Sequence, residues 1–139
     1  MAIFTNLFIF LFFSPLIKIS LDTPDFSDTV IPVTNNATSI VAVDYDPVEQ
    51  KIYWTDQSAG INRASVHDGL NQEQVVTKEL NTTDGMAVDY NGRNIFWTDT
   101  GMNRIEVERM DGTYRKILIS HGLDEPRDIS LGMYRMYSN

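Results

Sequence analysis

The sequence predicts an all-β protein built from repeated four-stranded antiparallel units, and three observations support this prediction. First, "KIYWTD" at 51–56 recurs as "NIFWTD" at 94–99, 43 residues later, with similar sequence on both sides. Second, the segments around these two phrases are short runs rich in Val, Ile, Thr and aromatic residues, separated by turn signals. Third, no window shows a sustained apolar period of about 3.6 residues, which an amphipathic helix would require.

Each unit is expected to hold four strands in about 43 residues, which is the size of one β-propeller blade. The strands of the first unit are predicted at 39–45, 51–56, 61–67 and 72–78. The strands of the second unit are predicted at 85–90, 94–99, 104–110 and 115–120. Two earlier segments, 18–23 and 28–33, are predicted to be the outer two strands of a preceding, incomplete blade.

The repeated phrase is interpreted as the second strand of its blade and as a structural motif. Side chains alternate along a strand, so Tyr53 and Thr55 should point to one face and Trp54 and Asp56 to the other. A blade is covered by neighbours on both faces, which suits large aromatic residues on both sides. The Thr and Asp oxygens are expected to accept backbone N–H groups where the strand gives way to the turn at 57–61. The motif residues are Tyr53, Trp54, Thr55, Asp56, Phe96, Trp97, Thr98 and Asp99.

The amino-acid composition excludes several classes of partner and of functional site. The formal net charge is −8, from 11 Lys and Arg against 19 Asp and Glu, which argues against nucleic acid or an anionic membrane surface as a partner. The chain has no cysteine, so disulfides, thiolate chemistry and cysteine-based zinc sites are excluded. His67 and His121 each sit beside a turn, and neither has another histidine with which to complete a catalytic site. Asp44 and Asp89 recur with the repeat, which favours a structural role such as bonding to turn backbone.

The chain is divided into three segments. Residues 1–17 are almost all apolar and are interpreted as a hydrophobic leader, either a candidate signal peptide or an atypical start, outside the fold. Residues 18–131 are the partial propeller, and residues 132–139 are a divergent tail.

The phrase Y-W-T-D, with "AVDY" before it and "NR" then "DG" after it, resembles the class B repeat of the low-density-lipoprotein receptor family. The segments "AVDYDPVEQKIYWTD" and "NIFWTDTGMNRIEV" are most similar to the Wnt co-receptor branch of the receptor-related proteins. The resemblance covers residues 18–131 and implies a six-bladed YWTD β-propeller, of which this chain supplies two to three blades. The cysteine-rich module that follows each propeller in the family is absent from this sequence.

The resemblance implies an extracellular ligand-binding module, displayed at the plasma membrane in the parent receptor or secreted if the leader is a signal peptide. Its implied partners are secreted proteins, namely Wnt proteins and their antagonists, together with the remaining blades of the parent receptor. No enzyme activity, small-molecule substrate, cofactor or metal is expected. Two alternatives stay open: an inactive truncated product, and a calcium-dependent six-bladed propeller hydrolase, which would need Asn, Asp and Glu ligands from several blades.

Family ligands use the face that carries the loops after strands two and four of each blade. Here those loops are 57–60, 79–84, 100–103 and 121–126. The ligand-face candidates at or beside them are Asn62, Arg63, Met102, Asn103, Arg104, Glu125 and Arg127. Two sequences, "NAT" at 36–38 and "NTT" at 81–83, fit the N-glycosylation acceptor and make Asn36 and Asn81 candidates in a secreted chain.

Overall fold

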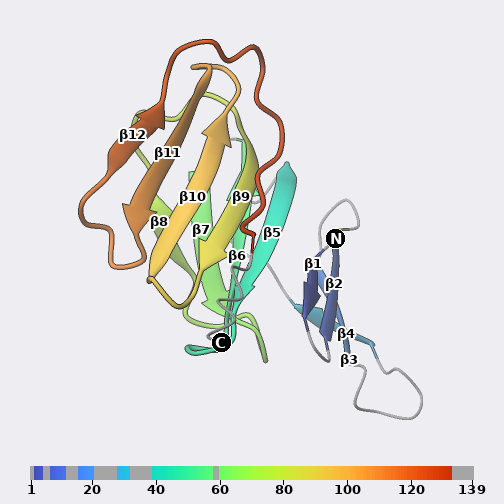
Figure 1. Ribbon diagram of the computed structural model, residues 1–139. Helices are drawn as coiled ribbons and strands as arrows, with labels where there is room; N and C mark the ends of the chain where they lie inside the picture. The colour runs from blue at the N-terminus through green and yellow to red at the C-terminus, as the bar shows by residue number, and fades with distance from the viewer. Residues whose placement is uncertain are drawn as a thin grey trace, which may run out of the picture.

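A computed structural model of the chain describes residues 2–4, 7–11, 16–20, 28–31, 39–57 and 60–132. These residues form three four-stranded antiparallel sheets, and no helix occurs among them. Figure 1 shows the third sheet, β9–β12, stacked face to face with the second, β5–β8, while β1–β4 lie to one side near β5. The all-β prediction and the four-strand unit are confirmed.

The first sheet has the strand order β1-β2-β3-β4. Its strands are β1 (Ala2–Phe4), β2 (Leu7–Leu11), β3 (Leu16–Ser20) and β4 (Asp28–Ile31). Strands β3 and β4 are the outer pair predicted from 18–23 and 28–33. Strand pairing also extends into 1–17, contrary to the prediction that these residues lie outside the fold, because that run of Ile, Leu and Phe has high strand propensity. Its identity as a signal peptide stays a prediction.

The second and third sheets follow the predicted repeat. The second sheet contains β5 (Ile40–Asp46), β6 (Lys51–Asp56), β7 (Gly60–Ser65) and β8 (Glu73–Val76). The third contains β9 (Thr83–Asp89), β10 (Asn94–Asp99), β11 (Arg104–Arg109) and β12 (Lys116–Ile119). In both sheets the strands pair in chain order, so every connection within a sheet is a hairpin.

The two hydrophobic cores lie between sheets. Trp54 packs with Val43, Ile52 and Ile31, which belongs to the first sheet. The neighbouring residue Tyr53 points the other way. It packs in a second core with Ile61 and Val76 of its own sheet and with Met86, Val88, Ile95 and Trp97 of the third sheet. The predicted alternation of the aromatic pair is therefore confirmed, and each sheet depends on its neighbour for burial.

The Thr-Asp pair binds backbone, as predicted, but most of the N–H groups belong to a different segment. Thr55 Oγ1 accepts from Ala42 N at 3.0 Å, and Thr98 Oγ1 accepts from Gly85 N at 2.8 Å. Both donors lie on the first strand of the sheet, at the register shift where the ladder to the second strand is interrupted. The predicted site, the turn after the strand, was wrong for the threonines because the bulge leaves the N–H groups of the first strand unpaired.

Asp99 accepts backbone hydrogen bonds both from the segment before β9 and from the turn after β10. Its Oδ2 accepts from Asn81 N at 2.9 Å, and its Oδ1 accepts from Thr82 N at 3.2 Å and from Met102 N at 3.0 Å. The first two donors precede β9, and the third lies in the turn after β10. We call Thr98 and Asp99, with these donors, the Thr-Asp clamp.

The recurring aspartates are structural, although they do not act alike. Asp44 Oδ2 accepts from Val88 N at 2.7 Å and so joins β5 to β9 of the next sheet. Burial raises the pKa of Asp44, and the bonds from Val88 and Tyr45 N–H groups offset part of that shift. Asp89 Oδ1 instead accepts from Gly92 N at 2.9 Å in the turn that follows it. Bonding to turn backbone was the role predicted for both aspartates, and of these two contacts only that of Asp89 fits it.

Candidate functional site

Loops that are far apart in the sequence meet at one end of the second and third sheets. We call this the loop end and define it by residues 79–84, 100–103 and 121–127. Thr100 Oγ1 lies 2.8 Å from Asp84 Oδ2 and 2.7 Å from the Pro126 carbonyl oxygen, and Glu125 N donates to Asn103 Oδ1 at 2.9 Å. The Thr100 hydroxyl has one proton, so it donates to one of its two acceptors at a time. The predicted clustering of these loops is therefore present in the structure.

Asp84 holds the loop end together. Its side chain is 6% exposed and accepts from Arg127 Nη1 at 2.8 Å, from Thr100, and from Gln57 Nε2 at 3.2 Å. Burial favours the protonated acid, but the hydrogen bonds from Thr100, Arg127 and Gln57 outweigh it and lower the pKa of Asp84. The largely buried carboxylate of Asp84 thereby holds the Arg127 guanidinium in place at the surface.

Four of the seven candidates, Met102, Asn103, Glu125 and Arg127, are exposed at the loop end. The side chains of Glu125 and Arg127 are 65% and 63% exposed and pair with each other at 2.7 Å. Met102 is also exposed, on the turn that ends in Asn103. An exposed apolar side chain beside a charged pair held in place by Asp84 is suited to contact another protein. The apolar side chain can be buried against the partner, and the charged pair can fix the partner's orientation.

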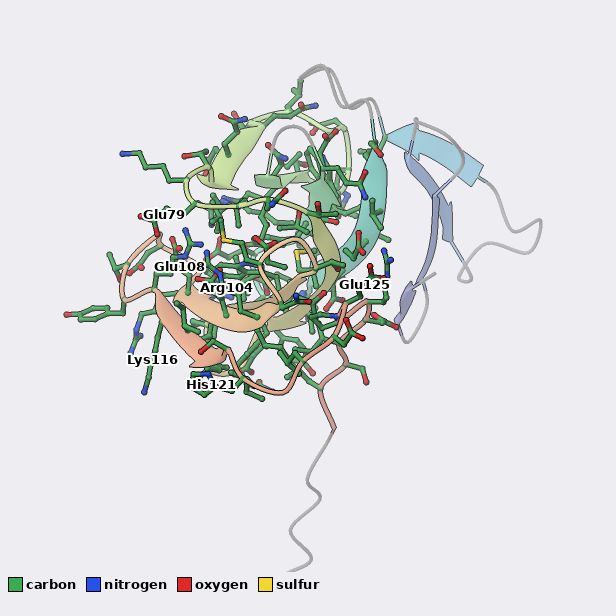
Figure 2. The ribbon with its side chains drawn as sticks, turned by 90° about the horizontal axis from the view of Figure 1, so that it is seen from above. Glu79, Arg104, Glu108, Lys116, His121 and Glu125 are labelled. Atoms are coloured by element: carbon green, nitrogen blue, oxygen red, sulfur yellow. The ribbon has the colours of Figure 1, made fainter. Side chains whose placement is uncertain are left out.

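Arg104 supports the sheet and is not free at the rim. Its Nη2 donates to the Glu79 carbonyl at 2.7 Å, and its Nε lies 2.8 Å from Glu106 Oε1. Figure 2, seen from above, labels Glu79, Arg104 and Glu125. In this view Arg104 lies toward Glu79, whereas Glu125 lies on the side nearer the first sheet.

Asn62 and Arg63 are not brought to the exposed rim. Asn62 is buried and donates from Nδ2 to the Gly60 carbonyl at 3.2 Å. The Arg63 guanidinium reaches the opposite end of the sheets, where Nη1 donates to the Met110 carbonyl at 3.0 Å and to the Tyr53 hydroxyl at 3.2 Å. The ligand-face role of all seven candidates stays a prediction, and these contacts give Arg63 a clear structural role.

A pocket of about 330 Å³ opens at that opposite end, between the second and third sheets. It is lined by Glu49, Arg63, Arg93, Arg109, Met110 and Asp111. Arg93 forms ion pairs with Asp46 and Glu49, and Arg63 pairs with Glu73 at 2.6 Å. The Arg109 guanidinium lies over the Tyr114 ring, 5.7 Å from its centroid, so all three guanidinium groups have contacts within the protein.

Neither metal-binding nor membrane-spanning features emerge from the described residues. No group of three or more His, Asp or Glu side chains among them could hold a metal ion. The same part of the chain contains no helix of the length and apolarity needed to cross a membrane. His67 and His121 are both exposed, in separate turns.

Repeated four-stranded sheets with cores between them, and a Thr-Asp clamp at the second strand, define this chain as part of a YWTD-type β-propeller. Residues 93–131 match the family model described as low-density lipoprotein receptor repeat class B. These residues are therefore similar to the class B repeat of the low-density-lipoprotein receptor family.

Relatives extend the match beyond residues 93–131. The chain is 51% identical to low-density lipoprotein receptor-related protein 5 of Homo sapiens over 78 residues, which are 56% of this chain and 5% of that protein. It is 40% identical to nidogen-2 of Mus musculus over 80 residues, or 57% of this chain and 6% of that protein. A solved nidogen/laminin complex matches 88% of this chain and 47% of its own chain, with 32% identity and a TM-score of 0.76. The chain thus spans about one-twentieth of the length of these curated relatives.

Proposed function

We propose that the chain is a ligand-binding part of an extracellular YWTD propeller and that its ligands are secreted proteins. The most direct support is the 51% identity over 78 residues to a lipoprotein receptor-related protein, together with the separate class B match at residues 93–131. The Wnt co-receptor resemblance makes Wnt proteins and their secreted antagonists the first ligands to test. The nidogen/laminin complex adds laminin as a third ligand to test, because laminin assembles there with a protein of the same fold.

The surface proposed for contact lies on the exposed part of the loop end and comprises Met102, Glu125 and Arg127. Asp84 and Thr100 lie beneath it and hold Arg127 and the 126 carbonyl in place. Arg127 and Glu125 already pair with each other, so a ligand would exchange that exposed ion pair for its own charges at little cost. Such a rim sets orientation and specificity, and Met102 provides apolar contact.

The test is a binding measurement by biolayer interferometry. The full chain is immobilised, and a purified Wnt protein, a secreted Wnt antagonist and laminin are each supplied in solution. At least one is expected to bind with a dissociation constant tighter than about 1 µM, or about −8 kcal/mol. The double variant Glu125→Ala/Arg127→Ala is expected to weaken that binding about twofold to fivefold, since an exposed charged pair contributes about 1 kcal/mol or less.

The matched control is Arg109→Ala/Asp111→Ala, which removes the same two charges at the opposite end of the sheets and should leave affinity unchanged. Equal losses in both double variants would contradict the assignment of the loop end. Failure of all three proteins to bind a folded chain would contradict the proposed function and favour the alternative of an inactive product.

A further inference from the structure

We propose that Asn81 carries an N-linked glycan, attached through its side-chain Nδ2. Asn81-Thr82-Thr83 is the acceptor sequence, and it lies in the connection from β8 to β9, at the loop end. Many such triplets occur by chance, so the proposal depends on what the fold does with each of the three residues.

The Asn81 amide is exposed and is not used to build the fold. Within the described part of the chain its Nδ2 donates no hydrogen bond, and its Oδ1 receives only a long contact of 3.5 Å from Thr82 Oγ1. Other asparagine amides here are structural: Asn62 Nδ2 donates to the Gly60 carbonyl, and Asn94 Nδ2 donates to Asp89. Replacing a hydrogen of the Asn81 amide with a sugar therefore breaks no internal contact.

The backbone beneath this amide is rigidly placed. Asn81 N and Thr82 N both donate to Asp99, and Thr100 N donates to the Thr82 carbonyl at 2.8 Å. The Asn81 side chain lies across Gly101, where a Cβ would come within 2.5 Å of Asn81 Cγ. A glycan would thus start from a fixed point on the turn that carries Met102, beside the proposed ligand surface.

The burial of Thr83 determines whether the glycan is attached before or after folding. Thr83 is only 2% exposed and pairs with Asp99 in the β9–β10 ladder. The acceptor sequence requires the hydroxyl of this third residue, which the folded sheet covers. The glycan must therefore be transferred before β9 pairs with β10, while the segment is still extended and unfolded.

The transfer uses a lipid-linked oligosaccharide diphosphate as the sugar donor. The bond from the sugar C1 to the diphosphate oxygen breaks, and a bond from C1 to Asn81 Nδ2 forms. The amide loses one proton, the lipid diphosphate leaves, and no oxidation or reduction takes place. The proposal shares with the proposed function only the passage of the chain through the secretory pathway.

The experiment expresses the full chain in mammalian secretory cells and treats it with peptide-N-glycosidase. That enzyme converts a glycosylated asparagine to aspartate, which peptide mapping locates directly. Asn36→Gln is placed in all samples, because 36–38 is also an acceptor sequence. We expect conversion at residue 81 in this background and in Thr83→Ser, and none in Thr83→Val, which keeps Asn81 but removes the hydroxyl.

Asp99→Ala tests the order of events, because it removes the carboxylate that holds Asn81 and Thr82 in the folded loop. Transfer before folding predicts occupancy equal to or above that of the parent chain, whereas transfer to the folded loop predicts a loss. Absence of conversion at residue 81, or its persistence in Thr83→Val, would overturn the site itself. Binding affinity plays no part in this readout, so its failure is distinguishable from failure of the proposed function.

Discussion

Replacing Asp99 with alanine is expected to be among the most damaging single changes in the third sheet. The side chain is fully buried and accepts three backbone N–H groups, from Asn81, Thr82 and Met102, at 2.9–3.2 Å. Each is a charge-assisted bond, worth about 1.5–3 kcal/mol when lost from a buried site. Both ends of the clamp would come loose together: the start of β9 and the turn after β10.

The three losses should not add in full, because the donors are only partly buried and water can reach some of them. We therefore expect Asp99→Ala to lower the free energy of unfolding by about 3–5 kcal/mol. Asp99→Asn should cost less. Its remaining carbonyl oxygen can still accept from Thr82 and Met102, while its NH₂ group would face the Asn81 N–H.

The assay is urea unfolding followed by tryptophan fluorescence, which reports on Trp54 and Trp97, 1% and 0% exposed. With a slope of about 1.5 kcal/mol/M, the expected loss lowers the midpoint by about 2–3 M. Asp124→Ala is the matched control, since it removes the same charge from an exposed position. If Asp99→Ala and Asp124→Ala unfold at the same urea concentration, the carboxylate does not hold the clamp and the reasoning is wrong.

Three further outcomes are expected at fixed protein concentration. Gly85→Ala should cost about 1–3 kcal/mol, because its Cβ would meet the backbone of 127–129 at 2.8–3.0 Å, whereas a Cβ at Gly132 meets nothing within 4 Å and Gly132→Ala should cost under about 1 kcal/mol; equal urea midpoints would contradict this. Arg63→Ala should lower stability by about 1–3 kcal/mol, with Arg63→Lys recovering only part of the loss, and an unchanged midpoint would show that its contacts to Met110 and Tyr53 contribute nothing. Because the pKa of Asp84 is lowered in the folded state, its stabilisation is complete above its unfolded pKa of about 3.9 and is lost as the pH falls through the folded value. Urea midpoints measured from pH 7 to pH 3 should therefore fall less steeply in Asp84→Asn than in the parent chain, and parallel curves would exclude this linkage.

Strand positions were predictable where a single local pattern determined them. The bounds of β6 and β10 match the prediction at both ends, because an apolar and aromatic run is closed by Thr-Asp at a turn. The outer strand β8 is shorter than predicted, ending at Val76, since a strand with only one neighbour loses pairing at its ends. The segment "LDEPRDISL" at 123–131 follows "LNTTDGMAV" at 80–88 by the repeat interval of 43 residues. It forms no strand, although 127–129 lie against Gly85.

The loop end was predictable as a group of loops, whereas its internal contacts depend on packing between sheets. Arg63 was assigned to that end from its position in the chain, but its long side chain extends the other way to a carbonyl of the next sheet. Asp84 and Thr100 were missed because both look like ordinary turn residues. One signal was present: Asp84 and Arg127 occupy the same repeat position, 43 residues apart, with opposite charges.

Because each core lies between successive sheets, the order of synthesis matters to this chain. The second sheet is complete once Val76 has been made, but Tyr53, Ile61 and Val76 gain their packing partners only from residues 86–110. At typical ribosome speeds, roughly 2–7 seconds separate Val76 from Met110. During that interval the newest sheet presents an apolar face with no partner, so a nascent chain stalled there should be a substrate for chaperones that bind exposed aromatic strands.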